Sequence, residues 1–403
     1  MDPAGPLSGI LVVDFTRVIA GPVATQTLAD LGADVVKIEH PAGGDDTRGY
    51  RDPEIAGQST FFMAFNRNKR SVALDLSVPE AVTVARDLVA KADIVVENFS
   101  AGVMAKYGLD YDSLAALNPR VIYVAGSAYG RDGAYRSRAG YDPVVQAESG
   151  FLSLNGFPDG EPVRTGIAMI DVTTGLGLVQ ACLAALIHRE RTGRGQYVEV
   201  GLFDTALQMC LHFGMRHLLT GETPTRVGNS SPGAAPNGTF RAKDGPFQLT
   251  VAGDRVWRKL CQDVLGRPEL VDDPAFATGA ERAANKDALH RVLDEIFLTD
   301  TRDRWVEKMR AMKVPAGPIR TVAEACESPE VKERDLVRRA PCTGVGQVPV
   351  LRSPMRFEKT PVREPFGVPA LGEHTETVLH DLLGYDAART AALRAAGAFG
   401  TKR

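Results

Sequence analysis

The first forty residues constrain the fold most strongly, because two short apolar runs flank one helix-like segment. Residues 10–15 (ILVVDF) form a continuous apolar run, which is typical of a strand buried on both faces. An amphipathic segment follows from AGP at 20–22 to Leu31, and Pro22 suits the first turn of a helix. Residues 34–39 (DVVKIE) then form a second apolar run. This βαβ order predicts a parallel, Rossmann-like sheet.

The alternation of strand-like and helix-like sequence continues beyond this unit. Further strands are expected at residues 71–76, 92–97 and 120–125, with helices at 79–91 and 111–117. A composition rich in Gly, Pro, Ser, Thr and Asn begins near residue 220, and 403 residues exceed the size of one hydrophobic core. We therefore predict an α/β fold with a large Rossmann-like domain at 1–200, completed by 330–403, a linker at 201–237 and a smaller α+β domain at 238–325.

Composition argues against several classes of protein. The net charge of -3 provides no basic footprint for nucleic acid or for an anionic membrane. The five cysteines are odd in number and form no CxxC pair, which favours a reducing, cytoplasmic location. The N-terminal stretch MDPAGPLSG lacks the basic and apolar regions of a signal peptide. The apolar run at 172–187 is shorter than the roughly 20 residues that cross a bilayer, so it predicts a buried helix.

Several familiar catalytic motifs are incomplete in this sequence. Glu39 ends the second expected strand, where NAD-binding folds place an acidic residue, but the first turn reads TRVIAGP and lacks the GxGxxG fingerprint. His212 and His217 are five positions apart and do not share a helix face, so no metal site is predicted. The segment GSAYG at 126–130 resembles the GxSxG motif of serine hydrolases only loosely.

The segment GIAMIDVTTG at 166–175 contains an isolated carboxylate. Asp171 is the only charged side chain between Gly166 and Ile187. One interpretation is structural, because Asp is a favoured N-cap and an apolar helix is expected just after it. The other is chemical, because a poorly hydrated carboxylate at a helix start can attack an acyl carbon. The residues alone leave both interpretations open.

A series of longer motifs runs in order along nearly the whole chain. They are LSGILVVDFTRVIAGP (7–22), LGADVVKIEHPAGGDDTR (31–48), FNRNKRSVALDL (65–76), ADIVVENFSAGVMAKYGL (92–109), NPRVIYVAGSAYG (118–130), RAGYDPVVQAESG (138–150), HRERTGRGQYVEVGLFD (188–204), VPAGPI (314–319) and LGEHT (371–375). This set resembles the class III CoA-transferases, the family that includes formyl-CoA:oxalate and carnitine CoA-transferases. It is most similar to the branch that uses short dicarboxylates, such as succinate–hydroxymethylglutarate CoA-transferase.

The resemblance implies a site and a mechanism. Asp171 matches the family's catalytic aspartate, which forms an aspartyl–acyl anhydride and then an aspartyl–CoA thioester, with no metal and no cofactor beyond the CoA substrate. The positions that match CoA-binding residues of the family are Val18, Ala20, His40, Leu74, Asp75, Asn98, Phe99 and Lys106. The resemblance also implies an interlocked homodimer that moves CoA from a short acyl-CoA, such as succinyl-CoA, to a carboxylic acid, expected to be a short dicarboxylate. No nucleic-acid or membrane partner is expected.

Two departures from the family pattern affect this expectation. Oxalate-using relatives carry a glycine-rich loop that closes over the site, whereas residues 229–238 (NSSPGAAPNG) contain two glycines. The related α-methylacyl-CoA racemases use the histidine of an AGHD segment, whereas this chain reads AGYD with Tyr141. A tyrosine with a pKa of about 10 is a poor proton shuttle, which favours a transferase. Tyr141 is expected to pack beside the site, and a racemase or a non-catalytic CoA-binding protein are the alternatives.

Five basic residues have more than one interpretation. Lys69 and Arg70 could contact CoA phosphates or form a solvated charge pair. Arg48, Arg51 and Arg164 are candidates to bind the distal carboxylate of a substrate, and surface or structural roles are equally open for them.

Overall fold

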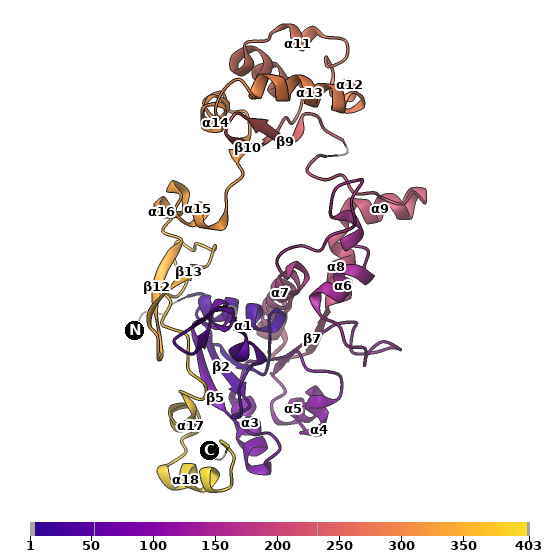
Figure 1. Cartoon of the computed structure of the whole chain (residues 1–403). Helices are drawn as coiled ribbons and strands as arrows, with labels where there is room; N and C mark the ends of the chain where they lie inside the picture. Colours follow the sequence, from indigo (N-terminus) through magenta and orange to yellow (C-terminus); the bar gives the residue numbers. More distant parts are fainter. Residues whose placement is uncertain (1–4, 52, 232, 401–403) are drawn as a thin grey trace. The chain divides into compact units, whose positions relative to one another are not determined.

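The computed structural model describes residues 5–51, 53–231 and 233–400, which form two compact units (Figure 1). Unit 1 comprises Met1–Phe151, Arg164–Leu219 and Glu330–Arg403, and unit 2 comprises Leu152–Val163 and Thr220–Pro329. Each unit has a hydrophobic core of its own. Of the N-terminal stretch considered as a signal peptide, residues 1–4 lie outside the described part of the chain.

Unit 1 is built on a six-stranded parallel sheet. Its strands are β1 (Leu11–Asp14), β2 (Asp34–Glu39), β5 (Lys69–Ala73), β6 (Ile94–Glu97), β7 (Ile122–Ser127) and β8 (Tyr197–Gly201). Their order across the sheet is β5-β2-β1-β6-β7-β8, and Val12 of β1 lies opposite Val35 of β2 and Ile94 of β6. The strand order reverses between β1 and β6, where sheets of this kind bind ligands at the carboxyl ends of their strands. The predicted Rossmann-like α/β fold is confirmed.

Helices cover both faces of this sheet (Figure 1). One face carries α1 (Ala20–Asp30) and α7 (Met169–Thr192), and the other carries α3 (Pro79–Lys91) and α5 (Tyr111–Leu117). Successive residues of β1 therefore enter different cores, Val12 on the side of α1 and α7 and Val13 on the side of α3 and α5. Burial on both faces explains why these strands read as continuous apolar runs.

Helix α7 is longer than the buried helix expected at 172–187. By length and composition it could cross a membrane, but half of its most apolar stretch is buried inside the protein. The buried side contributes Leu178, Cys182 and Ala185 to the core against the sheet. Leu176 and Ile187 lie on the opposite side and are exposed in this chain. We therefore interpret α7 as a core helix with a second, uncovered apolar face.

Most expected elements of unit 1 lie where the sequence placed them. The bounds of β2, α3 and α5 agree with the expected ranges. β6 and β7 each begin two residues later than expected, whereas β5 begins two residues earlier, at Lys69, a charged residue that is fully buried beside Asp14. β8 was not among the predicted strands. Its sequence YVEVG is partly covered on one side only in this chain, so it does not form a continuous apolar run.

The remaining elements of unit 1 surround the sheet edges. They are η1 (Asp46–Gly49), β3 (Glu54–Ile55), β4 (Gln58–Ser59), α2 (Thr60–Phe65), α4 (Val103–Lys106), α6 (Asp142–Glu148), α8 (Leu202–Met209), α9 (Leu211–Thr220), α16 (Pro329–Glu333), β12 (Val337–Cys342), β13 (Gly346–Leu351), α17 (Thr375–Leu383) and α18 (Ala387–Ala395). Residues 201–237, expected as a linker, thus begin with the two helices α8 and α9.

Unit 2 is a small α+β unit. Its antiparallel sheet has the order β11-β10-β9, formed by β9 (Asn237–Ala242), β10 (Gly245–Thr250) and β11 (Ala316–Pro318). Its helical segments are η2 (Leu152–Leu154), α10 (Asp254–Lys259), η3 (Leu260–Leu265), α11 (Glu269–Asp272), α12 (Gly279–Ala284), α13 (Lys286–Phe297), α14 (Arg302–Ala311) and α15 (Val322–Cys326). Phe240, Phe247, Trp257 and Phe297 are buried in its core.

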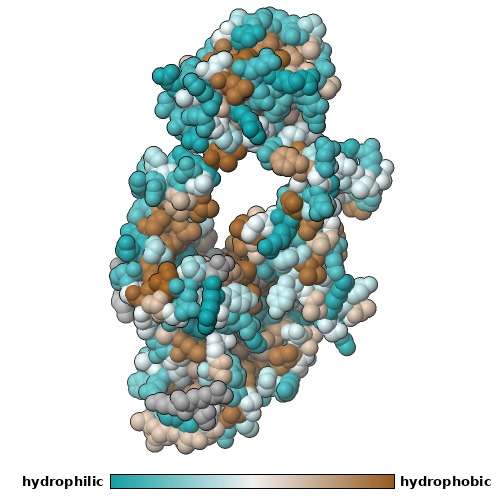
Figure 2. All heavy atoms as spheres, viewed as in Figure 1, coloured by the Kyte–Doolittle hydropathy of each residue, from teal (hydrophilic) through white to brown (hydrophobic). Residues whose placement is uncertain are grey.

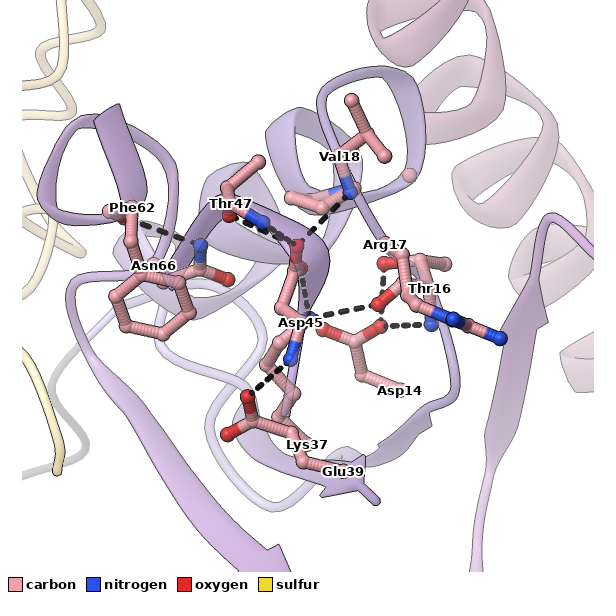
Figure 3. Close-up of polar contacts among 12 residues, drawn as sticks. Asp14, Thr16, Arg17, Val18, Lys37, Glu39, Asp45, Thr47, Phe62 and Asn66 are labelled. Carbon is pink, nitrogen blue, oxygen red and sulfur yellow. Dashed lines mark hydrogen bonds and ion pairs between the residues drawn. The ribbon is translucent and has the colours of Figure 1, made fainter. Parts of the chain in front are cut away.

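Buried charges lie beneath the turn that follows β1 (Figure 3). Lys37 Nζ is 3.0 Å from Asp45 Oδ2 and donates a 2.7 Å hydrogen bond to the carbonyl oxygen of Thr16. Lys69 Nζ is 3.2 Å from Asp14 Oδ2. All four charged side chains are fully buried. We call Asp14, Lys37, Asp45 and Lys69 the buried ion network.

Mutual pairing keeps the acids of this network ionised. Burial disfavours the charged forms of Asp14 and Asp45, but the neighbouring lysines and the hydrogen bonds from threonines together outweigh burial and lower the pKa of both carboxyl groups. Burial lowers the pKa of Lys69 to about 8, against the opposing attraction of Asp14. In this network, each buried charged form is therefore stabilised by the opposite charge beside it.

Replacing Lys37 with Met should destabilise the protein strongly. The substitution leaves the Asp45 carboxylate buried without its cation, which costs about 3–5 kcal/mol. We expect a lower midpoint of urea unfolding, followed by circular dichroism. Arg51→Met is the control, because the Arg51 side chain is 86% exposed and 3.6 Å from Glu54, and such surface pairs contribute about 0–1 kcal/mol. Equal midpoints for the two variants would contradict a structural role for the network.

Candidate active site

Two pockets of unit 1 open beside the carboxyl ends of β1 and β6. The lining of pocket A includes Phe15, Ile38, His40, Leu74, Asp75, Phe99 and Tyr107. The lining of pocket B includes Val18, Ala20, Asn98, Tyr141 and Asp171. Arg17 and Phe99 line both pockets, so the two pockets adjoin at the switch point of the sheet.

The turn after β1 separates the two pockets. Asn98 holds it from both sides, because its Oδ1 accepts a 2.8 Å hydrogen bond from Arg17 N and its Nδ2 donates a 2.8 Å bond to Arg17 O. Val18 has a φ of 71°, and its N–H donates to Asp45 Oδ1 at 3.2 Å (Figure 3). A β-branched residue at positive φ is strained, so the surroundings must hold it there. The buried ion network supplies that support through Asp45.

Seven of the eight predicted CoA-binding residues line these pockets. Val18, Ala20 and Asn98 line pocket B, His40, Leu74 and Asp75 line pocket A, and Phe99 lines both. Lys106 is exposed at the end of α4, with its ammonium group 5.4 Å from the ring centre of Tyr107 in pocket A. The structure thus brings these residues together, and their contact with CoA stays a prediction.

Lys69 and Arg70 are not placed to contact CoA phosphates. Lys69 is fully buried in the ion network, so neither the phosphate contact nor the solvated pair expected for it is correct. Arg70 Nε donates a 2.9 Å hydrogen bond to Asp34 Oδ1 between neighbouring strands. Both side chains hold strands of the sheet together.

The three candidate anchors for a substrate carboxylate do not line pocket B. Arg48 donates two 2.7 Å hydrogen bonds to the carboxylate of Glu39 and stacks over the ring of Phe62. Arg51 and Arg164 are exposed. Arg48 is therefore a structural residue, because its guanidinium group is committed to a buried acid.

Asp171 lies in the first turn of α7 rather than at its N-cap. The helix begins at Met169, and the cap position belongs to Ala168, which makes no side-chain capping bond. The N-cap interpretation of Asp171 is therefore wrong, because the helix starts earlier than the apolar periodicity indicated. Asp142 of α6 instead accepts hydrogen bonds from the N–H groups of Ile170 and Asp171.

The carboxylate of Asp171 is available for chemistry. It lines pocket B and accepts no hydrogen bond from the residues that the structure describes. Burial, reinforced by the negative charge of Asp142, raises the pKa of Asp171 to about 7. A carboxylate with a raised pKa is more basic than an ordinary aspartate.

Tyr141 lies beside Asp171 in pocket B, but it does not pack into unit 1. Its side chain is 67% exposed in this chain, and the residue caps the start of α6 through its backbone. The packing role expected for Tyr141 is therefore not met within the chain.

Arg17 and Asp142 are site residues that the sequence expectations omit. The guanidinium carbon of Arg17 lies 4.6 Å from the ring centre of Phe99, at the junction of the two pockets. Its position in the TRVIAGP turn, where a dinucleotide fingerprint has small residues, was the available signal. The sequence carried no such signal for Asp142, because the two backbone N–H groups that it accepts lie 28 and 29 positions further along the chain.

Asp171→Asn should stabilise the protein at neutral and alkaline pH. Native Asp171 holds its proton up to about pH 7, whereas the unfolded carboxyl group loses it above about pH 4. Between about pH 4 and pH 7 the unfolded state ionises and the native state does not, so the free energy of unfolding of the wild type falls as the pH rises. The loss is complete above about pH 7. We expect the variant's gain in thermal-unfolding midpoint to be larger at pH 8 than at pH 4.5. An equal gain at both pH values would contradict the raised pKa.

Comparison with known proteins identifies the family. Residues 7–375 match CoA-transferase family III. Succinate–glutarate CoA-transferase of Agrobacterium fabrum is 39% identical, over 94% of this chain and 96% of its own. Succinyl-CoA:glutarate CoA-transferase of Homo sapiens is 34% identical, over 98% of this chain and 90% of its own.

A solved structure agrees in fold as well as in sequence. The crystal structure of a CAIB/BAIF family protein from Brucella suis superposes with a TM-score of 0.84 at 41% sequence identity. The match covers 94% of this chain and 100% of that chain. This chain therefore belongs to the class III CoA-transferases.

Proposed function

We propose that this enzyme moves CoA from succinyl-CoA to a second short dicarboxylic acid through covalent intermediates on Asp171. Two relatives that match nearly the whole chain are named for succinate or succinyl-CoA and glutarate. The observation that carries the proposal is the Asp171 carboxylate, which lines pocket B without a hydrogen-bond donor among the described residues. A carboxylate in this state can act as a nucleophile because no structural contact occupies it.

In the first half of the reaction, Asp171 takes the CoA group from the donor. Its carboxylate attacks the thioester carbonyl, the C–S bond breaks, and CoA leaves as a thiolate while an aspartyl–acyl anhydride forms. The thiolate then attacks the aspartyl carbonyl, which releases the donor acid and leaves an aspartyl–CoA thioester. Each tetrahedral intermediate carries an oxyanion, which backbone N–H groups would have to stabilise.

The second half runs the same steps in reverse with the acceptor. The acceptor carboxylate attacks the aspartyl–CoA thioester and forms a new anhydride, with CoA again leaving as a thiolate. The thiolate attacks the acyl carbonyl of the acceptor, which gives the new acyl-CoA and regenerates Asp171. The thioester is conserved throughout, so no external energy source is required.

The linings of the two adjoining pockets offer apolar and cationic contacts to a CoA ester. Ile38, Leu74 and Phe99 give pocket A apolar walls that suit an adenine ring. Arg17 stands at the junction with its side chain 43% exposed, where it can face the diphosphate. A CoA molecule held in this way would extend its thioester end into pocket B, toward Asp171.

The proposed chemistry needs no cofactor beyond the CoA substrate. In the part of the chain that is described, no three His, Cys, Asp or Glu side chains are grouped so as to hold a metal ion. All five cysteines are free thiols, which supports a reducing, cytoplasmic location as part of the proposal.

We also propose that two chains form an interlocked homodimer. Exposed apolar side chains gather on three helices of unit 1: Leu176 and Ile187 of α7, Leu207 of α8, and Leu211, Met215, Leu218 and Leu219 of α9. Figure 2 shows apolar side chains at several separate places on the viewed face of the molecule. Exposed apolar patches of this kind mark interaction sites, and a second copy is the partner that the family resemblance implies.

The dimer is tested by its mass in solution. Light scattering should give twice the chain mass of 43.3 kDa. The double substitution Leu218→Glu and Leu219→Glu should shift the protein toward the monomer, because it places charges on an apolar contact. Leu117→Glu is the control, since Leu117 is 46% exposed at the end of α5 and outside this cluster. A monomeric mass for the unmodified protein would overturn the proposal.

The nucleophile is tested by trapping. Incubation with succinyl-CoA and hydroxylamine should convert the activated Asp171 carboxyl group into a hydroxamate, located by peptide mass spectrometry. Asp171→Asn should lower transfer to glutarate by ~10³-fold or more, because the variant lacks the nucleophile. Asp112→Asn is the control, since Asp112 is an exposed aspartate of α5.

The outcomes separate the competing functions. Modification of another residue, or full activity in Asp171→Asn, would sink the assignment of the nucleophile. Deuterium exchange at the α-carbon of a 2-methylacyl-CoA without any acid acceptor would indicate a racemase. Binding of CoA without exchange of labelled succinate into succinyl-CoA would indicate a non-catalytic protein. The mass of the product thioester across a set of mono- and dicarboxylate acceptors identifies the acid pair.

A further inference from the structure

The first turn of α7 is capped by a carboxylate from another helix. Asp142 Oδ2 accepts a 2.7 Å hydrogen bond from Ile170 N and a 3.1 Å bond from Asp171 N. The cap position, Ala168, provides no acceptor of its own. N–H groups at a helix start have no partner within the helix, so such an acceptor stabilises them. The backbone of the proposed nucleophile is thus held by a side chain of α6.

Asp142 is itself fixed in position. The residue is only 2% exposed, and its Oδ1 accepts a 2.5 Å hydrogen bond from Gln146 Nε2. Gln146 is fully buried and also bonds to Thr165, with its Nε2 donating to Thr165 Oγ1 at 3.0 Å and its Oε1 accepting from Thr165 N at 3.1 Å. These contacts join α6 to the segment that enters α7.

The negative charge of Asp142 is stabilised by N–H groups rather than by a cation. Within residues 5–51, 53–231 and 233–400, all of its hydrogen bonds come from amide N–H donors, and no Lys, Arg or His pairs with it. The partial positive charge of the α7 N-terminus favours the anion. The carboxylate of Asp171, on the same turn, therefore finds these N–H groups occupied and faces a second negative charge.

We propose that Asp142 is the positioning residue of the nucleophile: it occupies the N–H groups at the start of α7, so that the carboxylate of Asp171 stays free for the acyl-CoA. This inference rests on the proposed function, in which Asp171 attacks the thioester. An aspartate in the first turn of an uncapped helix would turn toward the free N–H groups, and those bonds would make it a weaker nucleophile.

The charged surroundings of Asp171 agree with this role. The titratable groups that line its pocket are Arg17, Asp46 and Tyr141, and those on elements packed against α7 include Asp30, Glu199 and Asp204. Burial is the larger cause of the raised pKa of Asp171, and Asp142 is the one charged group among the described residues that adds to it.

The experiment compares variants that separate two properties of Asp142, its hydrogen bonds to the N–H groups of α7 and its negative charge. Asp142→Asn keeps an oxygen acceptor and removes the charge, so the pH midpoint of Asp171 acylation by succinyl-CoA should fall by about one pH unit. Because a less basic carboxylate is a weaker nucleophile, the acylation rate at pH 8 should fall several-fold, and the KM should stay within about twofold of the wild type because the acceptor is kept. Asp142→Ala removes the acceptor as well, and the rate should fall ~100-fold.

Asp386→Asn is the matched control. Asp386 caps α18 through a 2.7 Å hydrogen bond from Arg389 N and does not line pocket B. This variant should keep the wild-type acylation rate and pH midpoint. Wild-type values in Asp142→Ala, or equal losses in Asp386→Asn, would overturn the positioning role. Circular dichroism confirms that each variant is folded before its rate is compared.

A second measurement needs no turnover. The pH-dependent gain in thermal stability on Asp171→Asn should be smaller in the Asp142→Asn background than in the wild type, because the charge of Asp142 is part of its cause. If trapping fails while this coupling is seen, the proposed nucleophile fails and the contact between the two residues stands. If trapping succeeds while the two substitutions are additive, the positioning role of Asp142 falls.

Discussion

The buried ion network beneath the turn after β1 is the constraint on which the rest of the site depends. Its four charges come from β1, β2, β5 and the loop after β2, so it ties three neighbouring strands and a loop together. Asp45 extends this support to the backbone of Val18, whose positive φ is strained for a β-branched residue. The wall between pockets A and B therefore takes its shape from pairs that no substrate touches.

Two buried aspartates perform related tasks at the two ends of the site. Asp45 accepts the N–H of Val18, and Asp142 accepts the N–H of Asp171. Their electrostatic effects differ, because Asp45 is paired with Lys37 whereas Asp142 is held by amide groups alone among the described residues. The negative charge of Asp45 is thus neutralised beside the turn after β1, whereas that of Asp142 has no cation beside the proposed nucleophile. Burial is the larger cause of the raised pKa of Asp171, and the uncompensated charge of Asp142 adds to it, whereas Asp45 has a lowered pKa.

The sequence was sufficient for features that depend on local pattern. The apolar runs of β1 and β2 predicted a parallel sheet, and the motifs around Val18, Leu74 and Asn98 predicted residues that the structure gathers in two pockets. Pairing between residues far apart in the sequence could not be predicted from local pattern. The burial of Lys69 follows from Asp14 on another strand, and the cap of α7 follows from Asp142 on another helix. A charged residue in a sequence looks the same whether its partner is water or a buried acid.

The raised pKa of Asp171 suits an enzyme that exchanges CoA between carboxylic acids. Ordinary carboxylic acids have a pKa of about 4, so their carboxylates are weaker nucleophiles and better leaving groups than one with a pKa of about 7. In the proposed mixed anhydride on Asp171, thiolate attack on the aspartyl carbonyl expels the substrate acid, whose lower pKa makes it a better leaving group than Asp171. The bias is the same for every substrate acid of ordinary pKa, although it opposes the last step with the acceptor, in which the thiolate attacks the acceptor's carbonyl and must expel Asp171. Discrimination between acids must therefore come from contacts with the rest of the acyl chain and not from the reacting aspartate.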